Sequence, residues 1–195
     1  MAEIFFIPLL MMSFKKSRLF KKGGKMKKIL LILFLLIVGC YLLDDNAKST
    51  VFLTQDGTKV GNIVFKDTAQ GLMVRVHLKN LPKGEHGFHI HENPSCEAAA
   101  DEKGVMQPAL KAGGHYDPDK TKQHLGPEGS GHKGDLPLLM VSENGDVQIE
   151  FYTPRLTVKE VRDRSIVVHE NGDNYEDTPM PLGGGGKRIA CGVIK

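Results

Sequence analysis

Histidines that could bind metal ions gather in three segments of this chain. Seven of its eight histidines fall in these segments, and an aspartate follows the last histidine of the middle one. In chain order the residues are His86, His89 and His91, then His115, His124, His132 and Asp135, and finally His169. Imidazole nitrogens and carboxylate oxygens are common ligands of zinc and copper. These groups are numerous enough for two metal ions, one of them supplied by three separate segments.

One candidate set consists of imidazoles only. His89 and His91 lie two residues apart in a segment with the period of a β-strand, so both side chains point to one side and the alternating apolar residues point to the core. A solvated pair of histidines is the alternative for this spacing. Adding His115 and His169 gives four imidazole nitrogens, a set that square-planar Cu(II) prefers.

The second candidate set includes the carboxylate. His115, His124, His132 and Asp135 offer three imidazoles and one carboxylate, which fit a tetrahedral zinc site. Their spacing is wider than in a zinc finger, so we expect the loop to wrap around the ion. His115 belongs to both sets because an imidazolate can bind one metal with each nitrogen, although the spacing by itself does not show a bridge.

The N-terminal residues have the composition of an export signal. Met26 is followed by two lysines, an apolar run and then Cys40. This order is typical of a bacterial lipoprotein signal, so we expect removal of residues 26–39 and lipidation of Cys40, with residues 40–47 as the lipidated start and a short tether. A transmembrane anchor is the alternative, but a span needs about 20 apolar residues and this run is broken at Asp44. The predicted location is the bacterial cell envelope, either in the periplasm or on the outer face of the membrane.

Residues 1–25 do not fit in front of such a signal. They contain a second apolar start and a basic stretch, and residues 22–25 can be encoded by a purine-rich sequence of the kind that binds ribosomes just upstream of a start codon. We therefore expect translation to begin at Met26, with residues 1–25 as a spurious extension.

The basic character of the chain belongs to its first part. The full sequence has 26 Lys and Arg against 23 Asp and Glu, a formal charge of +3. Eight of these bases and one of the acids lie in the first 39 residues, which leaves 18 bases and 22 acids, a formal charge of −4. A net acidic domain gives no support for nucleic-acid binding.

Residues 48–195 are long enough for one domain and show the period of β-structure. Apolar and polar residues alternate in short segments with turn signals between them, such as Asp56–Gly57 and Asn144–Gly145. The expected strands cover 51–54, 60–65, 73–78, 84–91, 138–141, 147–151, 165–169 and 189–194. About eight short strands predict an all-β, antiparallel Greek-key sandwich or barrel, with one helical turn at 157–160.

Two long segments fit no strand and adjoin the candidate ligands. They are 92–137, rich in Gly, Pro and His, and 170–187, which contains four consecutive glycines. Loops of this length are uncommon in a compact domain unless they are functional. Once Cys40 is assigned to lipid, Cys96 and Cys191 are an even pair in an oxidising compartment, where a disulfide is the expected state and buried thiols are the alternative. Such a bridge would contribute about 4 kcal/mol by chain entropy.

Five motifs follow one another in the order HGFHIHENPSC (86–96), GGHYDP (113–118), GHKGDLP (131–137), VVHENGDNYEDTPMPLGGGG (167–186) and KRIACGVI (187–194). In this order they resemble the copper/zinc superoxide dismutases, especially the bacterial exported branch, in which the residues at 135–137 and the glycine run are typical. The resemblance covers residues 48–195. It implies a Greek-key β-barrel enzyme with one copper and one zinc ion per subunit.

The resemblance also implies a role for each candidate residue. It implies copper at His89, His91, His115 and His169, and zinc at His115, His124, His132 and Asp135. Asp173 matches the aspartate that joins a copper ligand to a zinc ligand, and Arg188 matches the arginine that attracts the substrate anion. Cys96 and Cys191 would be the family's disulfide, whereas His86 matches a structural histidine and is not counted as a ligand.

The implied reaction converts two superoxide anions and two protons into oxygen and hydrogen peroxide. In the family's cycle copper alternates between Cu(II) and Cu(I), and His115 takes up a proton while its other nitrogen stays on zinc. Arg188 would steer the anionic substrate electrostatically. The rival prediction is an envelope lipoprotein that binds copper or zinc without turnover, and the shared histidine and Arg188 weigh against it. The resemblance leaves the oligomeric state open, a homodimer included.

Overall fold

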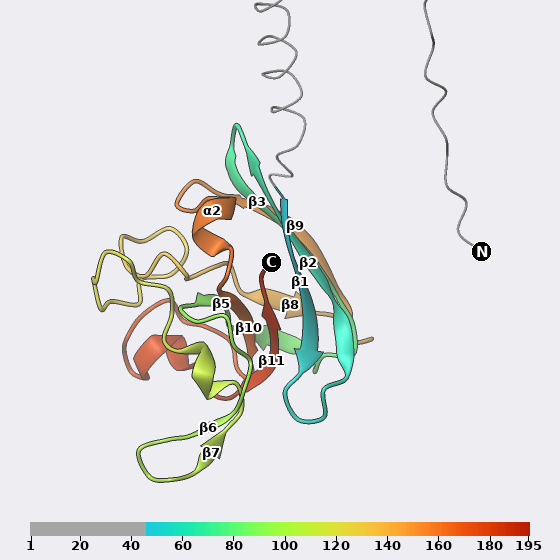
Figure 1. The fold of residues 1–195 in the computed structure, drawn as a ribbon, viewed down its shortest axis with the longest axis vertical. Coiled ribbons are helices and arrows are strands. Elements are labelled where there is room, and N and C mark those ends of the chain that lie inside the picture. Colours follow the sequence, from blue (N-terminus) through green and yellow to red (C-terminus); the bar gives the residue numbers. More distant parts are fainter. Residues whose placement is uncertain (1–45) are drawn as a thin grey trace, which may run out of the picture. The chain divides into compact units, whose positions relative to one another are not determined.

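Residues 46–195 are described by a computed structural model of the chain (Figure 1). The first strand begins at Asn46, two residues before the predicted start of the domain. The predicted extension 1–25, the signal 26–39 and the lipidation site Cys40 lie outside the described residues and stay predictions. Among residues 46–195, no helix is long and apolar enough to cross a lipid bilayer.

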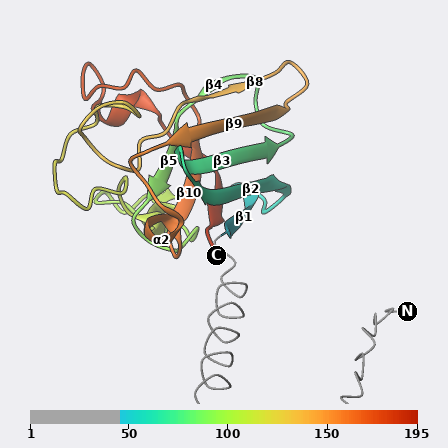
Figure 2. The ribbon, with the colours of Figure 1, turned by 90° about the horizontal axis from the view of Figure 1, so that it is seen from above.

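Seven antiparallel strands form the main sheet, in the order β5-β10-β11-β1-β2-β3-β9. They are β1 (Asn46–Leu53), β2 (Lys59–Thr68), β3 (Gly71–Leu78), β5 (Phe88–His91), β9 (Val147–Thr153), β10 (Ser165–His169) and β11 (Arg188–Val193). The sheet curls strongly, and β4 (Gly84–His86) and β8 (Leu139–Val141) pair with each other beside β9 (Figure 2). β3 neighbours β9 in the sheet although five other strands lie between them in sequence. The predicted all-β Greek-key fold is confirmed.

Alternation along the strands directs one face of the sheet to the core. In β3, Val74 and Val76 are fully buried, whereas Arg75 and His77 are exposed. The buried faces of the strands meet in one apolar cluster that includes Phe88 and Ile90 of β5. Because a close-packed core has low compressibility, β5 is a rigid support for the histidines that lie next to these two residues.

The helical turn is also confirmed. α2 (Val158–Val161) begins after Thr157, whose Oγ1 accepts a hydrogen bond from the Glu160 N–H at 3.3 Å. A hydroxyl in this position satisfies one of the backbone donors that the first turn of a helix leaves unpaired.

The prediction of one continuous strand over 84–91 is wrong. This segment is divided at Gly87 into β4, which pairs with β8, and β5, which pairs with β10. At the division, the Gly87 N–H donates to the Asn171 carbonyl at 2.7 Å, and the Gly87 carbonyl accepts from the His169 N–H at 2.8 Å. The backbone therefore leaves one ladder and enters another, and β5 is aligned with β10 where the ligand candidates lie.

The turn signal at Asn144 and Gly145 marks a turn, but the strands on its two sides do not pair with each other as a hairpin. The Gly145 N–H donates to Ser142 O at 2.9 Å, and the Ser142 N–H donates to Asp146 O at 3.0 Å. Beyond the turn the strands take different partners, since β8 pairs with β4 and β9 pairs with β3. The turn residues thus fix the reversal of the chain but not the pairing of the strands.

The two long segments lie together on one side of the barrel, away from β2 and β3 (Figures 1 and 2). The first contains β6 (Ala99–Ala100), β7 (Met106–Gln107) and the 3₁₀ turn η1 (Leu110–Ala112), and the second contains the 3₁₀ turn η2 (Pro181–Gly184). Cys96 and Cys191 form a disulfide with a Cα–Cα distance of 5.7 Å. The predicted bridge is therefore confirmed, and it fastens the first segment to β11.

Candidate metal centre

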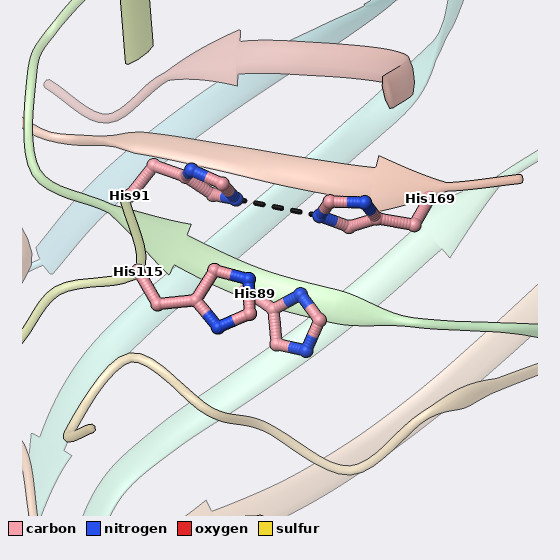
Figure 3. A group of neighbouring side chains, drawn as sticks. All are labelled: His89, His91, His115 and His169. Carbon is pink, nitrogen blue, oxygen red and sulfur yellow. Dashed lines mark hydrogen bonds between the residues drawn. The ribbon is translucent and has the colours of Figure 1, made fainter. Parts of the chain in front are cut away.

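Four imidazoles converge at one buried place. His89 and His91 come from β5, His169 ends β10, and His115 comes from the first long segment. Their ligand atoms lie within 4.8 Å of one another. His91 Nε2 and His169 Nε2 face each other at 3.4 Å, with His89 and His115 beside them (Figure 3). The structure thus brings together every residue of the predicted copper set.

Backbone carbonyls decide which ring nitrogen of two of these histidines is available. His91 Nδ1 donates to the Gly113 carbonyl at 2.9 Å, and His169 Nδ1 donates to the Gly186 carbonyl at 3.2 Å. A neutral imidazole carries only one N–H, so these contacts leave Nε2 of both rings as a lone-pair donor. The two donors are the same pair that face each other across the site.

Asp173 fixes a third ring and connects it to the second cluster. Its Oδ2 accepts from His89 Nε2 at 2.7 Å, which leaves His89 Nδ1 as the donor to a metal. Its Oδ1 accepts from His124 Nε2 at 2.8 Å and from the Tyr175 N–H at 2.8 Å. A Cβ on Gly183 would collide with this carboxylate, and the φ of Gly183 is +71°, so the glycine run closes over Asp173 instead of forming an open linker.

A second cluster surrounds Asp135. Its Oδ1 lies 2.9 Å from His115 Nδ1 and 3.6 Å from His132 Nδ1, and its Oδ2 lies 3.0 Å from His124 Nδ1. All four residues are buried. Because His115 directs Nδ1 to Asp135, its Nε2 remains for the four-imidazole set. One ring therefore belongs to both clusters.

The most compact group in this second cluster differs in one member from the predicted zinc set. The ligand atoms that lie within 4.8 Å of one another belong to His89, His115, His124 and Asp135. His89 enters this group because its ring stacks on that of His115, with 3.9 Å between the ring centroids. His132 lies farther out but directs Nδ1 to the same carboxylate.

Buried polar atoms without partners show that metal ions fit both clusters. In these two clusters, His89 Nδ1 and His132 Nδ1 make no hydrogen bond, and His124 Nδ1 and Asp135 Oδ2 face only each other, at 3.0 Å. A buried polar group without a hydrogen bond costs about 1–3 kcal/mol, so a group of such atoms in one place is unexpected unless something binds them. Imidazole and carboxylate donors of this kind suit copper and zinc.

The pKa shifts of His91, His115, His169 and Asp135 favour the protonation states that bind metals. Burial lowers the pKa of His91 and of His169, and burial with the nearby His89 lowers the pKa of His115 to about 3. Burial alone would raise the pKa of Asp135, but hydrogen bonds from His115 and the neighbouring histidines bring it well below its usual range. Neutral imidazoles and an ionised carboxylate are the forms that coordinate metals.

The chain matches the profile of the copper/zinc superoxide dismutase (SODC) family over residues 59–194. It belongs to the copper/zinc superoxide dismutases. A superoxide dismutase of Brucella abortus is 51% identical over 143 residues, which are 73% of this chain and 82% of the relative. One of Escherichia coli is 43% identical over 174 residues, which cover 87% of this chain and 100% of the relative. The solved Brucella abortus enzyme superposes with a TM-score of 0.74 at 47% identity, covering 77% of this chain and 99% of that one.

This membership confirms the predicted activity and cofactors. As a copper/zinc superoxide dismutase, the protein is an oxidoreductase that acts on superoxide and uses copper and zinc ions. The histidine clusters supply groups that could hold both metals.

Arg188 of this superoxide dismutase is held by the loop that the disulfide fastens. Its Nη1 donates to Ala109 O at 2.6 Å and its Nη2 to Gly113 O at 2.7 Å. Gly113 O also accepts from His91 Nδ1, so Arg188 lies beside the four-imidazole set. The side chain is half-buried, and burial lowers its pKa.

The sequence revealed Asp173 but not the backbone groups that orient the ligands. The carbonyls of Gly113 and Gly186 fix two imidazoles, and no residue type signals such a role for the backbone. His86, which the sequence set apart from the ligands, has its ring nitrogens 2.7 Å from His169 O and 2.8 Å from Pro82 O. It therefore fastens β4 to the end of β10 rather than facing the metal clusters.

Proposed function

We propose that this superoxide dismutase binds copper through His89, His91, His115 and His169, and zinc through His115, His124, His132 and Asp135. The proposal is supported chiefly by His89 Nδ1 and His132 Nδ1, which are buried without a hydrogen bond, and by His124 Nδ1 and Asp135 Oδ2, which face only each other. All four atoms belong to these two sets. It is supported further by Asp173, which orients one histidine of each set. Carboxylates that fix a ligand ring in this way raise metal affinity and set the tautomer.

The residues around the copper position have different roles in the reaction. Copper held by these four histidines would supply the one-electron exchange with superoxide. His115 directs Nδ1 to Asp135, so Nε2 is the atom at which a proton for the departing peroxide can be held. Arg188 presents a fixed cation beside His91 and His169 and attracts the anionic substrate, although the domain as a whole is acidic.

A comparison of two histidine variants tests the ligand assignment. His132→Ala removes a residue of the zinc set only, so we expect loss of zinc with copper retained. His77→Ala is the matched control, because His77 is an exposed histidine on β3. Metal content is measured after reconstitution of the protein, together with superoxide decay and its loss on adding a copper chelator. Retention of zinc by His132→Ala would refute the assignment, and bound metals without turnover would favour a non-catalytic metal-binding protein.

We further propose that the enzyme is an exported lipoprotein, with translation from Met26, a signal over 26–39, lipid on Cys40, a tether to residue 47 and the catalytic domain over 48–195. The length of the Escherichia coli relative supports the start, since 87% of 195 residues is about 170, the length of the chain without residues 1–25. Cys40→Ser should abolish labelling with a fatty acid, whereas replacing Cys96 and Cys191 together should not. Labelling of Cys40→Ser would exclude the lipid anchor.

The proposal of a lipid anchor also predicts the cellular location of the enzyme, whereas its oligomeric state needs a separate measurement. A lipidated enzyme would stay attached to the bacterial envelope, in the periplasm or on the outer face of the membrane. Sedimentation of the metal-loaded protein in detergent tests whether it forms the homodimer that the family resemblance allows.

A further inference from the structure

One arginine far from the ligand segment in sequence gathers the backbone of that segment. Arg155 lies in the turn between β9 and α2 and is partly buried. Its Nη1 donates to the carbonyls of Gly126 and Pro127, both at 3.1 Å. Its Nη2 donates to the carbonyls of Gly131 at 2.7 Å and His132 at 3.0 Å. Four hydrogen bonds thus join one side chain to two stretches of a single loop.

These carbonyls belong to the segment that holds three residues of the proposed zinc set. We call residues 123–135 the zinc loop. His124 lies at its start, and His132 and Asp135 lie at its end. The loop closes on itself where the His132 N–H donates to Gln123 O at 3.0 Å. Arg155 binds the part between these ends and also the carbonyl of His132, so it helps to set how far the first ligand lies from the last two.

The contacts use the shape of the guanidinium and not an ion pair. Within residues 46–195, no carboxylate forms a salt bridge with Arg155. The planar group presents several N–H donors at fixed angles, and it therefore can hold four carbonyls at once, whereas a lysine has a single nitrogen on a flexible stem. Without these bonds, the carbonyls of Pro127 and Gly131 would need other partners, whereas Gly126 O also accepts from the Gly129 N–H and His132 O from the Asp135 N–H.

The positive charge of Arg155 and its hydrogen bonds to the loop have opposite effects on the affinity for zinc. A cation close to the loop repels a zinc ion, so loss of the charge alone would strengthen zinc binding. Loss of the four hydrogen bonds would loosen the loop and weaken zinc binding. The sign of the change in zinc affinity therefore separates the two effects.

We propose that Arg155 is a positioning residue for zinc, because it holds the zinc loop by four carbonyls and thereby keeps His124 and His132 around Asp135. This inference rests on the proposed zinc set. Three of the four proposed copper ligands come from β5 and β10, and His115 is tied to β5 by a backbone bridge with His91. The effect of Arg155 should therefore fall on zinc and spare copper.

The test compares zinc affinity in the full protein, measured by competition with a chromophoric chelator. Arg155→Met and Arg155→Lys should each lower the affinity for zinc about 10–100-fold, which is the range for groups that orient metal ligands. Copper affinity should stay within about twofold. Co(II) placed in the zinc position should lose its intense tetrahedral absorption in both variants. Arg75→Met is the matched control, because Arg75 is an exposed arginine paired with Glu150 on the outer face of the sheet.

Each other outcome has a distinct meaning. Wild-type zinc affinity in Arg155→Met, or tighter binding, would overturn the inference and leave only a charge effect. Equal loss of copper and zinc, or a failure of Arg155→Lys to fold, would assign Arg155 to the fold as a whole and also overturn it. If the unaltered protein binds no zinc, the proposed zinc set itself is wrong. The zinc affinity of the unaltered protein is measured first, so this failure is distinguished from a failure of the inference about Arg155.

Discussion

Removal of the Cys96–Cys191 disulfide should strongly destabilise the metal-free domain. The bridge closes a loop with a sequence separation of 95 residues. By chain entropy, a loop of this length adds about 4.7 kcal/mol at 25 °C, near the upper end of the 2–5 kcal/mol found for native disulfides of small secreted domains. A domain of 150 residues unfolds with an entropy of about 0.3 kcal/mol/K, so Tm should fall by about 15 °C.

Two perturbations separate the crosslink from the packing of the sulfur atoms. Replacing both cysteines by alanine removes the bridge and the sulfur volume, whereas reduction of the unaltered protein removes only the bridge. Cys191 packs in a small buried cluster with Ala109, Ala112 and Val167, so the alanine variant also loses contacts there. If the unfolded-state entropy dominates, the reduced protein should lose nearly as much stability as the variant.

The assay is thermal unfolding of the protein without metals, followed by circular dichroism. Metals must be absent because ligands that bind only the folded state add stability by mass action and would conceal the effect. A fall of less than about 5 °C in the Tm of the reduced protein, one third of the expected shift, would show that the crosslink does not stabilise the domain by chain entropy. A large fall in the alanine variant but none on reduction would assign the stability to packing instead.

Three other perturbations follow from the site. Arg188→Ala should slow superoxide decay about tenfold and flatten its dependence on salt, with copper and zinc still bound, because one fixed cation is lost; unchanged salt dependence would contradict the steering role. In the metal-free protein, burial lowers the pKa of His124 but Asp135 and Asp173 raise it to about 9. Because this pKa exceeds that of an unfolded histidine, the stabilisation of the fold by protonated His124 is fully present below about pH 6.5 and is lost as pH rises through 9. Zinc binding should therefore release about one proton at pH 7 and almost none well above pH 9. Calorimetry in buffers of different ionisation enthalpy measures the protons released, and no release at pH 7 would contradict the prediction. Gly183→Ala should cost more stability and more bound metal than Gly104→Ala, because both positions have positive φ but only Gly183 faces the Asp173 carboxylate; equal melting shifts would show that the backbone conformation alone matters.

Local patterns predicted the elements better than their partners. Alternation identified β3 and the apolar face of β5 that packs on the core, and the capping pattern at Thr157 identified α2. The division at Gly87 was missed because both halves of the segment alternate in the same way, and only their neighbours differ. The separation of β8 from β9 was missed for a related reason, since a turn specifies a reversal and not the sheet that each strand joins.

The types and order of the ligand candidates could be read from the sequence, because few residue types bind copper or zinc and they stand in recognisable motifs. The family and its reaction followed from those motifs. Which ring nitrogen faces the metals could not be read, since it depends on carbonyls of Gly113 and Gly186 brought close by folding. The same holds for Arg155, whose four acceptors are backbone atoms more than 20 residues away. Backbone carbonyls are identical in every residue, so only the tertiary structure decides which of them orient a side chain.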